Sequence, residues 1–279
     1  MNRPLHLLVL AALLTACGIT SAVPSGDLAT TAPQPAARVA STEVHAVGPE
    51  LVTAAHRSSR PAQPVLAARY QADLVADHCV DRDLLTPEVA DPAFTILDRS
   101  YALPADYAPD DLVVASAAGL TESSTTKRVR SVVVDDLAAM RVAWEAAGLT
   151  VTIESAYRSY DSQALTFNSW VSRIGQPGAL LRTARPGHSE HQLGTAIDFT
   201  SPGWTGRFGD WATESAEGAW MAAHAWEYGF VISYPADSEA QTCFTYEPWH
   251  YRWIGRDAAA AQRASGVNLR QFLVGYAGS

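Results

Sequence analysis

The sequence predicts an α+β domain, in which helices and short strands are mixed along the chain. Residues 131–147 carry apolar side chains at spacings of four, three and four, which is the pattern of one buried helix face. Residues 149–155 alternate apolar and polar side chains, as half-buried strands do. Several shorter segments downstream show the same two patterns. The sequence contains no internal repeat. Such a mixture is typical of α+β domains.

Each expected element has a signal of its own. Pro and Asp residues punctuate a loop at 103–113. The first helix ends at Gly148, and a later one ends at Gly229. The apolar face of the first helix consists of Val133, Leu137, Met140 and Trp144. The remaining expected elements, in chain order, are a helix at 162–171, a strand at 197–199, a helix at 220–228, a strand at 230–234 and a strand at 251–254.

The composition excludes several classes of protein. The chain has 279 residues, of which 48 % are hydrophobic, so it is too long and too apolar to be wholly disordered. Its 20 Lys and Arg against 29 Asp and Glu give a formal net charge of −9, and we therefore expect no nucleic-acid partner. The 3 cysteines are too few for a small disulfide scaffold.

The first 16 residues have the parts of a secretory signal peptide, namely a positive start, an apolar run and small residues at a cleavage point. Residues 14–17, Leu-Thr-Ala-Cys, resemble a bacterial lipobox, in which the cysteine is lipidated and becomes the mature N-terminus. Cleavage as a plain secretory signal near Ala16 or Ala22 is the alternative. We predict an exported lipoprotein of a bacterial cell membrane, anchored through Cys17.

Residues 17–67 are rich in Ala, Pro, Ser and Thr and show little apolar periodicity. Such a composition cannot bury enough apolar surface to order itself, which predicts a flexible stalk. The folded domain is therefore expected at 68–279.

Two cysteines remain if Cys17 carries lipid. An exported protein sits where disulfides persist, and two cysteines allow one pairing, so we predict a Cys79–Cys243 disulfide. Two buried thiols are the alternative. A cysteine-rich metal site is excluded, because no CxxC spacing occurs.

Two stretches, at 185–198 and 246–252, combine histidines and carboxylates with turn residues. A catalytic zinc commonly takes three His or carboxylate ligands and leaves one position open, and His191, Asp198 and His250 would supply such a set. Glu247 would then be free to act as a general base. Spacing alone leaves a structural surface role open, and such ligands also accept other divalent ions.

Three motifs carry a resemblance to a known family. Residues 189–198 fit the pattern S-x-H-x-x-G-x-A-x-D, residues 247–250 fit E-x-W-H, and residues 157–163 fit Y-R-S-Y-x-x-Q. In their order along the chain, 157–163, 189–198 and 247–250, these motifs resemble those of the VanY-like D-alanyl-D-alanine carboxypeptidases, and the resemblance covers residues 100–272. The resemblance implies a zinc-peptidase domain of the hedgehog/DD-peptidase type, with a small, mainly antiparallel sheet flanked by helices.

The resemblance also implies roles for individual residues. His191, Asp198 and His250 match the ligands of one zinc ion, and Glu247 matches the catalytic acid and base. Arg158 matches the arginine that faces the substrate and supports the charge on the scissile carbonyl, while Gln163 and Ser189 match substrate-binding positions. Alternative interpretations remain for three of them: a surface ion pair for Arg158, an exposed helix position for Gln163, and a turn cap for Ser189. We interpret the neighbouring His188 as a rim or turn residue and Glu190 as structural.

The resemblance implies hydrolysis of the terminal D-Ala of peptidoglycan stem peptides. We expect a monomer, which the lipid anchor would place at the cell wall. An L,D-carboxypeptidase or a peptidoglycan endopeptidase of the same fold is the alternative within enzymes. A non-catalytic, zinc-containing wall-binding module is the alternative outside them.

Overall fold

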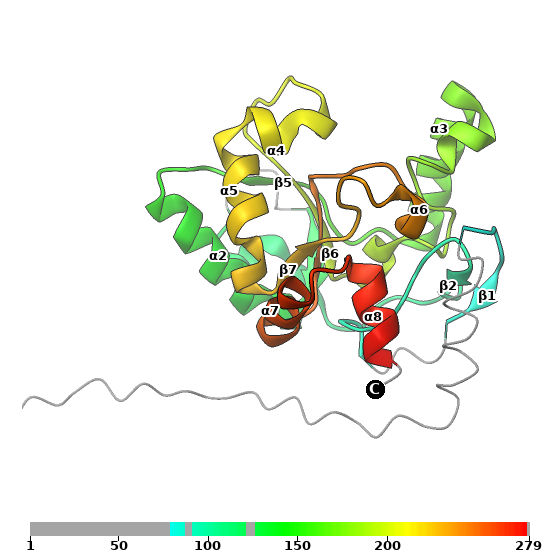
Figure 1. The fold of residues 1–279 in the computed structure, drawn as a ribbon, viewed down its shortest axis with the longest axis horizontal. Helices are drawn as coiled ribbons and strands as arrows, with labels where there is room; N and C mark the ends of the chain where they lie inside the picture. Colours follow the sequence, from blue (N-terminus) through cyan, green and yellow to red (C-terminus); the bar gives the residue numbers. More distant parts are fainter. Residues whose placement is uncertain (1–78, 87–90, 121–125, 278–279) are drawn as a thin grey trace, which may run out of the picture. The chain divides into compact units, whose positions relative to one another are not determined.

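A four-stranded antiparallel sheet organises the part of the chain that carries the motifs (Figure 1). The structure, a computed structural model, describes residues 79–86, 91–120 and 126–277, all within one compact unit. The strands are β5 (Thr152–Ser155), β6 (Ala196–Thr200), β7 (Phe230–Ile232) and β8 (His250–Trp253), in the spatial order β5-β6-β8-β7. The α+β prediction and the small antiparallel sheet are confirmed.

The other elements surround this sheet. Two short pairs complete the strands, β1 (Leu84–Leu85) with β2 (Tyr101–Ala102) and β3 (Leu112–Val114) with β4 (Arg128–Arg130). The α-helices are α2 (Val134–Ala146), α3 (Tyr160–Ala179), α4 (Trp211–Glu214), α5 (Ala216–His224), α6 (Glu239–Thr242), α7 (Arg256–Ser265) and α8 (Leu269–Ala277). The 3₁₀ turns are η1 (Ala115–Ala118), η3 (Ser131–Val133), η4 (Glu190–Leu193), η5 (Phe208–Asp210) and η6 (Ala225–Tyr228).

Strands β6 and β8 each build two different surfaces, because successive side chains of a strand point to opposite faces. Ile197 and Phe199 of β6 and Tyr251 of β8 belong to the apolar core. In that core they join Leu137, Met140 and Trp144 of α2. In Figure 1, α2 and α5 lie together on one side of the sheet. The polar residues of the same strands are thereby left for the opposite face.

The structure contains the predicted helices and strands, but several of them begin or end at other residues than expected. Helix α2 buries Leu137, Met140 and Trp144 of its expected face, Val133 is buried just before it in η3, and Gly148 lies beyond its end with φ +75°. Strand β5 begins three residues later than expected, since the Leu149 amide still bonds the Trp144 carbonyl at the end of α2. Helix α3 is longer than expected, because Ser159 caps its start and the helix continues through a kink at Gly175.

The predicted signal peptide, the predicted lipidation at Cys17 and the whole of the predicted stalk lie outside the described residues. Among the helices that the structure describes, none has the length and apolar character needed to cross a bilayer.

The predicted disulfide is confirmed. Cys79 and Cys243 are bonded, with their Cα atoms 5.4 Å apart and a sequence separation of 164 positions. Cys243 follows α6 in a left-handed conformation, with φ 68°. The bridge therefore ties the first described residues to the segment that leads into the second motif.

Candidate metal centre and active site

Three buried side chains converge on the polar face of the sheet. Asp198 in β6 pairs directly with His250 in β8, so the strand register brings the two together. His191 comes from η4, the turn that leads into β6. Asp198 Oδ2 lies 3.1 Å from His191 Nε2, and its Oδ1 lies 2.9 Å from His250 Nδ1. The candidate ligand atoms all lie within 4.8 Å of one another.

The other ring nitrogen of each histidine forms a hydrogen bond on the side away from Asp198. His191 Nδ1 lies 2.7 Å from the carbonyl oxygen of Ala156, and His250 Nε2 lies 3.0 Å from Glu190 Oε2. Both partners are acceptors, so each histidine donates to them and keeps the lone pair of its other nitrogen, on the side of Asp198, available for a metal ion. Two imidazoles and one carboxylate with this rear support fit a zinc ion that retains an open position.

The electrostatics of the three residues suit metal binding. Burial lowers the pKa of His191 and favours its neutral form, which is the one that binds metal. Burial would raise the pKa of Asp198, but the two histidines outweigh it and hold this pKa below its usual range. Burial lowers the pKa of His250, but hydrogen bonds to Asp198 and Glu190 raise it to about 10. A metal ion therefore competes with a proton at His250.

Glu247 lies in the turn before β8. Its amide bonds the Tyr234 carbonyl, and its own carbonyl accepts the amide of His250. The residue is only 8 % exposed. Burial, together with the nearby Asp198 and Glu190 carboxylates, raises the pKa of Glu247 to about 8. A bound dication would lower that pKa, because its charge favours the carboxylate. A carboxyl with such a pKa is suited to accept and return a proton near neutral pH.

Arg158 precedes α3 and points toward the three converging residues. Its Nη1 donates to Gln163 Oε1 at 2.7 Å, its Nη2 donates to Ser155 Oγ at 2.8 Å, and Nη2 lies 3.9 Å from Asp198 Oδ2. The side chain is 19 % exposed, so the surface ion-pair interpretation does not fit.

Gln163 is fully buried, which excludes the exposed helix position. Its amide nitrogen donates to Thr183 Oγ1 and to the Ala184 carbonyl, while its oxygen accepts from Arg158. Both amide hydrogens are thus used inside the protein. The geometry makes Gln163 a support of Arg158 and leaves no amide proton for the substrate-binding role that the resemblance implies.

Ser189 is buried at the N-terminal end of η4, with no side-chain capping hydrogen bond. The turn-cap interpretation is therefore wrong. Its expected substrate-binding role remains a prediction.

Sequence reasoning missed two residues that contact the ligand His250, and a third that supports one of them. Glu190, which we interpreted as structural, lies in η4, and its carboxylate reaches His250. Arg252 in turn donates to Glu190, and the Tyr234 ring stacks on His250 at 5.1 Å. No local spacing signals these contacts, since Glu190 and His250 lie 60 positions apart.

We interpreted His188 as a rim or turn residue; it is too deeply buried for a rim, and its amide bonds the Arg185 carbonyl at the end of a turn. Its Nδ1 lies 2.7 Å from the Asp98 carbonyl, and its Nε2 lies 3.2 Å from Asp83. It thereby connects the motif loop to the first described segment.

The α+β fold and the buried His/Asp/His set beside Glu247 define the site of a metallopeptidase. The VanY family model, described as D-alanyl-D-alanine carboxypeptidase, matches residues 126–256. YodJ of Bacillus subtilis strain 168, named as a carboxypeptidase, is 35 % identical over 179 residues, which cover 64 % of this chain and 66 % of YodJ.

Solved structures agree with these matches. The LdcB LD-carboxypeptidase is 35 % identical, with a TM-score of 0.57, and the match covers 63 % of this chain and 83 % of LdcB. The D,D-pentapeptidase VanY in complex with Zn(II) is 25 % identical, with a TM-score of 0.55, over 66 % of this chain and 99 % of VanY. This chain belongs to the VanY-like D-alanyl-D-alanine carboxypeptidase family, which confirms the resemblance.

Proposed function

We propose that the protein is a zinc-dependent D,D-carboxypeptidase that removes the terminal D-Ala from peptidoglycan stem peptides. One observation carries the proposal: three buried ligands, Glu247 and Arg158 share one site in a chain of this family. The zinc complex of the related VanY supports the choice of metal. The full set of active-site groups speaks against a non-catalytic wall-binding module.

The residues divide the chemistry of peptide hydrolysis between them. Bound zinc would supply a Lewis acid for the scissile carbonyl and for the attacking water. Glu247 takes a proton from that water as its oxygen bonds to the carbonyl carbon, and passes the proton to the leaving amine as the peptide bond breaks. Arg158, whose guanidinium stays charged, stabilises the negative charge that grows on the carbonyl oxygen.

An L,D-carboxypeptidase is the second candidate, because LdcB is 35 % identical to this chain and VanY only 25 %. The two activities differ in the residue that precedes the cleaved D-Ala. The ligands, Glu247 and Arg158 serve either bond equally well.

Hydrolysis of defined stem pentapeptides and tetrapeptides, followed by mass spectrometry, separates these functions. We expect the zinc-loaded protein to convert the pentapeptide to the tetrapeptide with release of one D-Ala. Cleavage of the tetrapeptide alone would establish the L,D activity in its place. Zinc binding without cleavage of either peptide would favour the binding module.

We further propose that the protein is exported and anchored to the cell membrane through lipidated Cys17, as a monomer that works on the adjacent wall. The signal-like first 16 residues and the lipobox-like residues 14–17 support this. Fractionation of cells expressing the wild type and Cys17→Ser tests the anchor. We expect only the wild type in the membrane fraction, and equal distributions would contradict a lipid anchor.

A further inference from the structure

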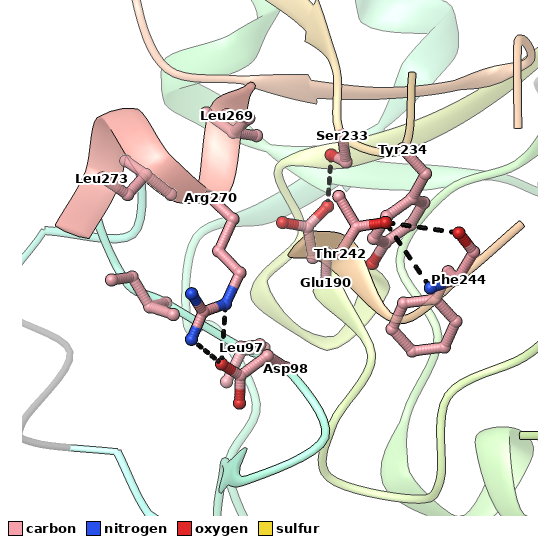
Figure 2. A pocket seen from close by; sticks show the side chains of 11 residues that line it. Leu97, Asp98, Glu190, Ser233, Tyr234, Thr242, Phe244, Leu269, Arg270 and Leu273 are labelled. Carbon is pink, nitrogen blue, oxygen red and sulfur yellow. Dashed lines mark hydrogen bonds and ion pairs between the residues drawn. The ribbon is translucent and has the colours of Figure 1, made fainter. Parts of the chain in front are cut away.

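A buried carboxylate stands behind one ligand of the proposed zinc site. Glu190 is 5 % exposed, and its Oε2 accepts a hydrogen bond from Ser233 Oγ at 2.5 Å and lies 3.0 Å from His250 Nε2. Its Oε1 accepts from Arg252 Nη1 at 2.8 Å. Glu190 also lines a cavity of about 20 Å³, where Figure 2 shows its bond to Ser233. A cavity of this size has room for about one water molecule.

Arg252, which donates to Glu190 through Nη1, is also hydrogen-bonded through Nη2 to a different segment of the chain. It is fully buried, and its Nη2 donates to the carbonyls of Pro92 at 2.7 Å and Thr95 at 2.8 Å. Residues 92–95 lie outside the 126–256 span that matches the family model. The segment before the family match thus supports Arg252, Arg252 supports Glu190, and Glu190 supports His250.

The contacts of Glu190 make it a hydrogen-bond acceptor toward His250. Its Oε1 is paired with the Arg252 guanidinium and its Oε2 accepts from Ser233 Oγ, so both oxygens face donors. A carboxylate placed in this way accepts a hydrogen bond from His250 Nε2, which therefore carries a proton. That proton placement leaves Nδ1, on the side of Asp198, as the nitrogen with the lone pair.

We propose that Glu190, held by Arg252, is a positioning residue that fixes His250 as an Nδ1 ligand and thereby strengthens zinc binding. The inference rests on the proposed function, because it concerns the same metal. A carboxylate behind a ligating imidazole fixes the ring orientation and raises its basicity, and loss of such a partner weakens metal binding about 10–100-fold.

The first test measures the zinc dissociation constant, by competition with a chromophoric chelator, in the wild type and in Glu190→Gln. We expect the constant of the variant to rise about 10–100-fold. Glu145→Gln is the matched control, because it also removes a carboxylate from an arginine, but at the exposed Arg141–Glu145 pair of α2. Its zinc affinity should equal that of the wild type.

A second variant separates positioning from stability. Removing one member of a buried ion pair leaves the other charge buried without a partner, which destabilises the fold. Replacing both members with apolar side chains of similar size can leave the fold intact. We therefore expect Glu190→Leu combined with Arg252→Met to unfold in urea closer to the wild type than Glu190→Gln does, in the metal-free state. Its zinc dissociation constant should still be raised at least about 10-fold. Recovery of zinc affinity together with stability would overturn the proposal.

The wild type provides a measurement that needs no substitution. Long-range ¹H–¹⁵N correlation spectra of the zinc-loaded protein should show the His250 proton on Nε2, hydrogen-bonded to Glu190. A proton on Nδ1 would overturn the proposal. A wild type that fails to bind zinc at all would refute the proposed function, whereas tight binding with an unchanged Glu190→Gln constant refutes only the role of Glu190.

Discussion

Glu247→Gln is expected to lower kcat for D-Ala release by about 10²–10⁴-fold, with zinc still bound. Glutamine has the same shape but cannot take the proton of the attacking water. The fold should tolerate the change, because Glu247 is buried and a neutral amide avoids the cost of burying a charge there. His191, Asp198 and His250 are untouched, so the zinc content should remain at one ion per chain.

The measurement pairs steady-state hydrolysis of a stem pentapeptide with metal analysis of the same sample. Glu239→Gln is the control, since Glu239 is an exposed glutamate eight positions earlier in the chain. Its kcat should match the wild type. Wild-type kcat in a zinc-loaded Glu247→Gln protein would show that another group carries the proton.

Removal of the Cys79–Cys243 disulfide is expected to have the largest effect on stability. Replacing both cysteines by serine should lower the free energy of unfolding by about 2–4 kcal/mol, because the bridge restricts a long loop of the unfolded chain. Urea unfolding of the wild type and the double serine variant, under oxidising conditions, measures the difference. The zinc affinity of the folded variant should change far less, since neither cysteine is a ligand.

Two controls accompany that experiment. The wild type in excess reductant should reproduce the urea midpoint of the double variant, because it has lost the same bond. Cys17→Ser should leave the midpoint unchanged, since Cys17 is outside the bridge. Equal midpoints for the oxidised wild type and the double variant would show that the bridge contributes nothing to stability.

The sequence predicted those parts of the site that lie in short motifs. His191, Asp198, His250 and Glu247 could be named because motif spacing restricts them and turn residues surround them. Helix α2 could be predicted because its apolar face is periodic.

The parts that could not be predicted depend on contacts between distant segments. Glu190 adjoins a ligand in sequence, yet its role depends on the turn of η4 and on Arg252, 62 positions away. Gln163 was placed at the substrate by its motif, but the structure directs its amide to Thr183 and Ala184. The ends of β5 and α3 depend on capping and on the bond from Leu149 to Trp144, which apolar periodicity does not encode.

The pairing of β6 with β8 makes the metal site and the apolar core inseparable. Asp198 and His250 alternate with Ile197, Phe199 and Tyr251 along the same two strands. Inserting or deleting one residue within either strand would exchange the faces downstream of the change, so ligands would turn into the core and aromatic rings into the active site. Insertions and deletions that alter substrate preference are therefore expected only in the connections between strands. Strands β6 and β8 must keep their lengths and their mutual register.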